Sequence, residues 1–138
     1  MLAENENVMR LRKAYQSWND TKGESMEEWM KLMDDSILFR SLAAGAPGME
    51  FTIDCHGKED LLRYFGGLKE GWQMVHYTPQ EFITEGDRVV VLSTCSFVNR
   101  NTQKKMDTPK CDVFLFKNGK IVDFFEFYDT YRCIAAAQ

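Results

Sequence analysis

The sequence "CDVFLFKNGKIVDFFEFYDT", residues 111–130, reveals more of the architecture than any other part of the chain. Six of its twenty residues are Phe or Tyr, and Asn118-Gly119 separates two alternating runs, which is the pattern of a β-hairpin. Asp112, Glu126 and Asp129 nevertheless lie inside these apolar runs. A buried carboxylate needs hydrogen bonds, a counter-ion or a proton. The question is whether these acids face a shared cavity or water.

The hairpin turn permits two registers. A two-residue turn at Asn118-Gly119 places Asp112 opposite Phe125 and sends Glu126 to the other face. A three-residue loop that includes Lys117 shifts the register by one. In that register Asp112, Phe114 and Phe116 share a face with Val122, Phe124, Glu126 and Tyr128. Both faces are largely apolar in either register, so helices can cover only one, and we expect a homodimer through the outer sheet face.

Helical periodicity precedes the strands. Apolar residues recur at helical spacing over residues 5–19, and Ser25 with Glu28 reads as a capping box that opens a second helix. The expected inward residues of the three helices are Val8, Leu11, Tyr15 and Trp18, then Met26, Trp29, Met30 and Met33, then Leu61, Leu62, Phe65 and Leu68. From Trp72 onward the period changes to two, which predicts strands over 72–84, 88–100, 107–116 and 120–130. This order predicts an α+β fold in which one curved antiparallel sheet wraps over three N-terminal helices.

Composition limits the classes of function. At 138 residues the chain is long enough for one domain, 1–138, with a core and a pocket. A net charge of −4 with scattered basic residues argues against a nucleic-acid partner. No apolar run approaches membrane-spanning length and the N-terminus lacks a secretion signal, so a cytoplasmic location is expected. Four cysteines without CxxC spacing and two distant histidines suggest no metal site, and no cofactor is expected.

The segments "DDSILF", "HGKEDLLRYF", "FITEGDRVVV" and "DVFLFKNGKIVDFFEFYDT" occur in this order over roughly residues 8–131. This arrangement resembles the nuclear transport factor 2-like (NTF2-like) superfamily, in particular its SnoaL-like polyketide-cyclase and ketosteroid-isomerase-like branch. The resemblance implies a cone-shaped fold with one deep apolar pocket, and many members dimerise through the outer sheet face. It also favours the register in which Asp112 and Glu126 share a face.

The resemblance suggests roles for the two acids. "DVFLF" matches the isomerase pattern Asp-x-Phe-x-Phe, whose aspartate donates to the substrate oxyanion, and this assigns that role to Asp112. Glu126 matches by position a pocket acid on the last strand that takes part in proton transfer in polyketide cyclases. The place of the isomerase base holds Arg40, and the place of its helix tyrosine holds Ala14, one residue before Tyr15. Steroid isomerase activity is therefore not expected.

Two functions remain open. The first is a cofactor-independent acid–base enzyme (isomerase, cyclase, dehydratase or hydrolase) acting on a small apolar, oxygen-bearing molecule, with Asp112 and Glu126 catalytic. The expected pocket residues are Tyr15, Trp18, Arg40, Phe65, His76, Cys95, Phe97, Phe114, Phe124 and Tyr128. The second is a non-catalytic module that binds a small ligand or dimerises. An enzyme needs both acids unclamped in one cavity, whereas a binding module predicts acids neutralised by a fixed base such as Arg40 or Lys110.

Overall fold

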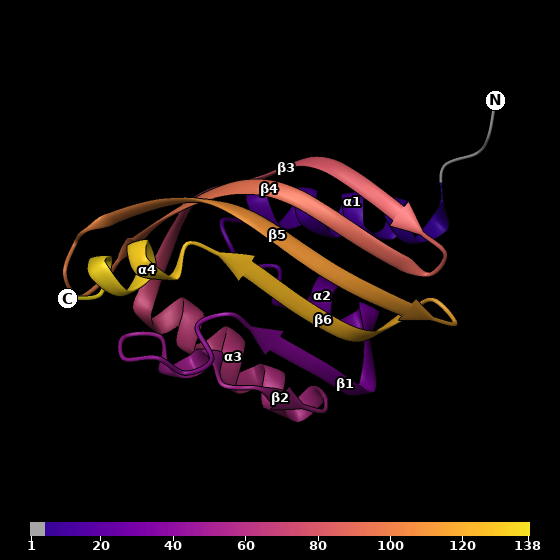
Figure 1. The fold of residues 1–138 in the computed structure, drawn as a ribbon, viewed down its shortest axis with the longest axis horizontal. Coiled ribbons are helices and arrows are strands. Elements are labelled where there is room, and N and C mark those ends of the chain that lie inside the picture. The colour runs from indigo at the N-terminus through magenta and orange to yellow at the C-terminus, as the bar shows by residue number, and fades with distance from the viewer. Residues whose placement is uncertain (1–4) are drawn as a thin grey trace.

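The computed structural model describes residues 5–138, with a strand-rich second half (Figure 1). The helices are α1 (Glu6–Asp20), α2 (Met26–Leu32), the 3₁₀ helix η1 (Glu50–Thr52), α3 (Lys58–Gly71) and α4 (Thr130–Ala136). The strands are β1 (Met33–Ser41), β2 (Cys55–His56), β3 (Trp72–Glu85), β4 (Arg88–Asn99), β5 (Lys105–Lys117) and β6 (Lys120–Tyr128). The first helix and the four long strands are confirmed, whereas β1, β2 and α4 were not predicted.

One curved sheet holds the six strands in the order β2-β1-β6-β5-β4-β3. The pairs from β6 to β3 are antiparallel, as expected, but β1 lies parallel to β6, so the sheet is mixed. Figure 1 shows the sheet arching over α1 and α2, with α3 beside β1 and α4 following the end of β6. This is the α+β cone that the sequence predicted, with an additional helix and two additional strands.

The α2 and α3 predictions need three corrections. Ser25 does precede α2, but its hydroxyl makes no capping hydrogen bond and is buried without a partner among the described residues. Met33 is buried as the first residue of β1 and is not part of the helix. Leu62 is 55 % exposed, and Tyr64, at 7 %, is buried in its place. Tyr64 lies three residues after Leu61 and therefore shares its helix face.

The β5–β6 hairpin combines features of both predicted registers. Asn118 and Gly119 have φ values of 52° and 76°, which defines the two-residue turn that closes on the pair Lys117–Lys120. Between Leu115 and Phe116 the pairing shifts by one residue. Beyond this bulge Asp112 pairs directly with Glu126, so the two acids share a face.

Val122 is the extra residue of the bulge, and this corrects the face to which it was assigned. Ile121 is fully buried opposite Phe116, and Phe124 is buried opposite Phe114, whereas Val122 between them is only half-buried. The alternation of inward and outward side chains along β6 therefore reverses once, at Val122. The bulge shifts the register by one residue, which is the shift that a three-residue loop would have given.

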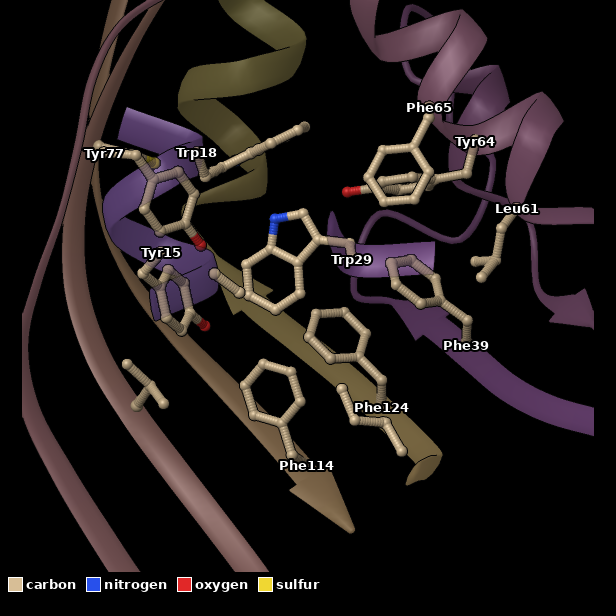
Figure 2. Close-up of a cluster of buried hydrophobic side chains, with 14 of the residues drawn as sticks. Tyr15, Trp18, Trp29, Phe39, Leu61, Tyr64, Phe65, Tyr77, Phe114 and Phe124 are labelled. Carbon is tan, nitrogen blue, oxygen red and sulfur yellow. The ribbon is translucent and has the colours of Figure 1, made fainter. Parts of the chain in front are cut away.

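Aromatic side chains dominate the core between the sheet and the helices (Figure 2). The ring of Trp29 stacks on Phe114 at a centroid distance of 6.2 Å, and Phe39 stacks on Phe124 at 4.3 Å. Trp18 meets Phe65 edge-on at 5.7 Å. These contacts join α2 to β5, β1 to β6 and α1 to α3, so the packing of these aromatic rings also shapes the interior space.

Candidate functional site

A cavity of about 90 Å³ lies between the inner sheet face and the helices. Figure 2 shows part of its wall, with the hydroxyl groups of Tyr15, Tyr64 and Tyr77 directed toward the middle. The lining residues are Tyr15, Trp18, Trp29, Met33, Phe39, Met49, Phe51, Thr52, Tyr64, Phe65, Leu68, Trp72, Tyr77, Cys95, Phe97, Met106, Thr108, Lys110, Asp112, Phe114, Phe124, Glu126, Tyr128 and Cys133.

Asp112 and Glu126 both line this cavity, and Lys110 lies between them. The Lys110 Nζ is 2.9 Å from Asp112 Oδ1 and 2.8 Å from Glu126 Oε1. Both acidic side chains are 3 % exposed and the lysine side chain 12 %. The sheet positions all three, because Lys110 and Asp112 are two residues apart on β5 and Glu126 is the cross-strand partner of Asp112 on β6.

Three tyrosines complete the hydrogen bonding of the two carboxylates. Tyr15 on α1 and Tyr77 on β3 donate to Asp112 Oδ2 at 2.5 and 2.7 Å. Tyr64 on α3 donates to Glu126 Oε2 at 2.7 Å. Tyr77 also accepts a hydrogen bond of 2.6 Å from Lys110. We call these six side chains, Tyr15, Tyr64, Tyr77, Lys110, Asp112 and Glu126, the polar cluster.

The surroundings raise the pKa of Lys110 and of the three tyrosines in the polar cluster. Burial alone lowers the pKa of Lys110, but the carboxylates of Asp112 and Glu126 outweigh it and raise this pKa well above its ordinary value. Burial, followed by the charge of the neighbouring carboxylate, raises the pKa of Tyr15, Tyr64 and Tyr77 well above theirs. The lysine is thus an ammonium ion and the tyrosines are neutral donors at physiological pH.

Two cavity thiols are held in the protonated form. Burial is the first cause that raises the pKa of Cys95, and of Cys133 on α4, to about 12 in each case. A nucleophilic cysteine needs a lowered pKa, so neither thiol is an activated nucleophile. All four cysteines are free.

Most side chains expected to line a pocket lie along the cavity. The exceptions are His76 and Arg40. Regular alternation after Met74 would turn His76 inward, but β3 contains a bulge at Val75, so the next buried residue is Tyr77. His76 instead places its Nδ1 3.2 Å from the hydroxyl of Thr78. The expectation that His76 lines the cavity is wrong because of this bulge.

Arg40 lies on the outer face of the sheet. Its neighbours Phe39 and Ser41 on β1 are buried, so the strand alternation turns Arg40 away from the cavity. There it forms an ion pair of 2.9 Å with Asp123 and lies 4.9 Å from the ring centroid of Phe125. Arg40 therefore neither binds a substrate carboxylate in the cavity nor neutralises the two acids. Lys110 is instead the basic partner of both acids.

Asp129, the third acid of the hairpin sequence, and Tyr15 on α1 also have defined contacts in the structure. Asp129 is structural, because its Oδ1 accepts a hydrogen bond from the backbone N–H of Arg132 and caps α4. Tyr15, although one residue away from the isomerase position, does reach Asp112. A tyrosine of the first helix thus contacts Asp112, while the position of the isomerase base holds Arg40.

Sequence reasoning did not assign Tyr64 and Tyr77 to the site, and it named Lys110 only as one possible basic partner of the acids. For Lys110 a signal existed, since alternation along β5 places Thr108, Lys110 and Asp112 on one face. Nothing local marks Tyr64 or Tyr77, because their partners lie 62 and 35 residues away in sequence.

Within residues 5–138, no group of three or more His, Cys, Asp or Glu side chains is arranged to hold a metal ion. No helix in this part of the chain is long and apolar enough to cross a membrane.

The family model of the SnoaL-like domain matches residues 11–124, which include most of the sheet, Asp112 and the two tyrosines that donate to it, Tyr15 and Tyr77. The chain therefore belongs to the SnoaL-like family of the NTF2-like superfamily. No curated protein matches the chain significantly.

Solved structures show the same fold. An NTF2-like protein of unknown function from Burkholderia pseudomallei has 19% identity and a TM-score of 0.83, over 98% of this chain and 99% of that one. TerC, co-crystallized with polyporic acid, has 17% identity and a TM-score of 0.78, over 96% of this chain and 98% of that one. A Catenulispora acidiphila protein with a ketosteroid isomerase-like fold, in complex with trimethylamine, has 14% identity and a TM-score of 0.73. The match covers 98% of this chain and 94% of that one.

Proposed function

We propose that the protein binds a small, largely apolar molecule in the aromatic cavity, with the polar end of that molecule at the polar cluster. The observation that carries this proposal is the position of Lys110 between both acids, 2.9 Å from Asp112 and 2.8 Å from Glu126. A basic side chain fixed between the two acids is what a binding site predicts, whereas an acid–base enzyme needs both acids unclamped. Two proteins of the same fold, solved with polyporic acid and trimethylamine, support a small ligand.

The shifts of pKa in the cavity also favour binding over catalysis. A general acid or base works best with a pKa near the operating pH. Lys110, the three tyrosines of the polar cluster and the two cavity thiols all have pKa values raised above their ordinary range. These groups hold their protons, so they can position a ligand but transfer a proton poorly.

The test is titration of the protein with two neutral probes of different shape, cyclohexylmethanol and 1-octanol. Saturable one-to-one binding is expected by calorimetry and by a change in fluorescence, because Trp18, Trp29 and Trp72 line the cavity. Cys95→Leu should weaken binding by about tenfold, because the larger side chain occupies cavity space at a cost of about 1–3 kcal/mol. Cys111→Leu, a matched change on the outer sheet face, should leave affinity unchanged. Failure of both alcohols to bind, or equal binding by Cys95→Leu, would contradict the proposal.

An acid–base enzyme is the second candidate, because both acids do line one cavity and are direct cross-strand partners. In this candidate Asp112 shares a proton with the substrate oxygen and Glu126 acts as the base. It requires the ligand to displace Lys110 from Glu126. Turnover of a ligand identified by binding, abolished in both Asp112→Asn and Glu126→Gln, would favour the enzyme.

A further inference from the structure

We propose that the ligand of this cavity is a monocation with an apolar body, an alkyl- or arylammonium ion whose charged end lies against Asp112 and Glu126. This inference rests on the proposed binding function and specifies its ligand class. Three independent properties of the cavity lead to it: its formal charge, the direction of its hydrogen bonds and the nature of its wall.

The formal charge of the cavity is negative. Among the lining side chains of the described chain, the charged groups are two carboxylates and one ammonium, which give a net charge of −1. Both carboxylates are 3 % exposed, so water provides little compensation. An uncompensated buried charge is costly, and a cationic ligand would supply the missing charge.

The hydrogen bonds of the polar cluster leave acceptors and no donors. The three ammonium hydrogens of Lys110 are matched by three oxygens, those of Asp112, Glu126 and Tyr77. The hydroxyl hydrogens of all three tyrosines point to carboxylate oxygens. A carbonyl or carboxylate of a ligand accepts hydrogen bonds. At the polar cluster it would face other acceptor oxygens, because the hydrogens of Lys110 and of the three tyrosines are already bonded.

Acceptor capacity does remain in the polar cluster. Each carboxylate oxygen has about two lone-pair sites. Asp112 Oδ1 and both oxygens of Glu126 have one protein donor each in the described chain. Three oxygens can therefore accept from an alkylammonium group, which carries up to three N–H donors. Charge-assisted hydrogen bonds of this kind are roughly twice as strong as neutral ones.

The rest of the wall suits a cation as well. Aromatic rings surround the space, among them Trp18, Trp29 and Trp72. The faces of such rings attract ammonium groups, most strongly where water is excluded. The indole N–H of Trp29 is a donor in the same cavity, but it belongs to α2 and not to the polar cluster.

The test compares three probes with the same six-carbon ring at pH 7: cyclohexylmethylamine, cyclohexylmethanol and cyclohexanecarboxylate. By titration calorimetry the amine should bind about tenfold or more tightly than the alcohol, and the carboxylate should bind most weakly. An alcohol that binds as tightly as the amine, or a carboxylate that binds more tightly, would overturn the inference and leave the proposed binding function standing. If none of the three probes binds, the proposed function fails and the inference fails with it.

Two variants test whether the acids cause the preference. Glu126→Gln and, independently, Asp112→Asn bring the cavity to a formal charge of zero, so the affinity ratio of amine to alcohol should fall by about tenfold toward one. Glu24→Gln is the matched control, because Glu24 pairs with Lys69 at 2.7 Å on the exposed surface, and it should keep the ratio. Near-ultraviolet circular dichroism and alcohol binding show that each variant is folded. A ratio unchanged in a folded acid variant would refute the assignment of the charge to this cluster.

Discussion

The ammonium group of Lys110 contacts oxygens on three strands, those of Tyr77 on β3, Asp112 on β5 and Glu126 on β6. Two carboxylates on neighbouring strands repel each other unless a positive charge separates them. Because the pKa of Lys110 is raised well above its ordinary value, the lysine keeps this charge over the physiological range. A protonated lysine is not a nucleophile, which argues against Schiff-base chemistry in this cavity.

Lys110→Met should destabilise the protein by about 3–5 kcal/mol at pH 7, because it leaves two buried like charges without a counter-ion. The measurement is urea unfolding of both proteins at pH 7. Lys69→Met, which removes a lysine from the exposed pair with Glu24, should have little effect. Equal stability of Lys110→Met and the wild type at pH 7 would show that the acids are not held as charged carboxylates.

At the scale of elements, two β-bulges account for the wrong faces predicted for His76 and Val122. The bulge at Val75 brings Tyr77 into the cavity in place of His76, and the bulge at Val122 places Ile121 inward and restores Glu126 to the face of Asp112. A period of two predicts a face only while the alternation is unbroken. Neither bulge has a local marker such as glycine, so tertiary packing specifies both.

The elements that were not predicted are short or paired over a long distance. β1 contains Asp34 and Asp35 before its apolar residues, and its parallel partner β6 lies over 80 residues away. α4 has seven residues and depends on the cap by Asp129 and on packing of Cys133. The long strands and α1, in contrast, carry their periodicity in their own sequence, and this is why they could be predicted.

Adjacent glycines in α3 offer a matched test of how this helix shapes the cavity. A methyl group added at Gly67 would overlap the Cβ of Phe51 and lie 2.9 Å from its Cγ, and Phe51 lines the cavity. A methyl group at Gly66 meets nothing within 4 Å. Gly66→Ala should therefore stabilise the protein by about 0.5–1 kcal/mol through helix propensity. Gly67→Ala should destabilise it by about 1–3 kcal/mol through overpacking.

Thermal and urea unfolding of the two glycine variants measure these effects. Gly67→Ala should also alter the binding of cyclohexylmethanol, because Phe51 must move. If Gly67→Ala were as stable as Gly66→Ala, the close contact between α3 and η1 would not constrain the cavity wall.

At the scale of the whole molecule, the outer sheet face continues the apolar pattern that the hairpin sequence suggested. Ile83, Val90, Val113 and Phe125 form a row of directly paired residues across β3, β4, β5 and β6. Phe127 stacks on Phe125 at a centroid distance of 4.4 Å and is 38 % exposed. No helix of the described chain covers this face in Figure 1. We propose that a second copy of the chain covers it, because the paired apolar row is continuous across four strands and Phe127 extends it.

Sedimentation velocity tests the dimer. The wild type should sediment as a dimer at micromolar concentration, and Phe127→Glu should shift it toward the monomer, because a carboxylate in the middle of an apolar interface is costly to bury. Leu62→Glu is the matched control, since Leu62 is a similarly exposed apolar residue, 55 % exposed, but lies on α3. It should leave the sedimentation coefficient unchanged. A monomeric wild type, or dissociation by Leu62→Glu and not by Phe127→Glu, would contradict an interface on the outer sheet face. Because the cavity lies on the other face of the sheet and Phe127 does not line it, Phe127→Glu should retain its affinity for cyclohexylmethanol, which separates assembly from binding.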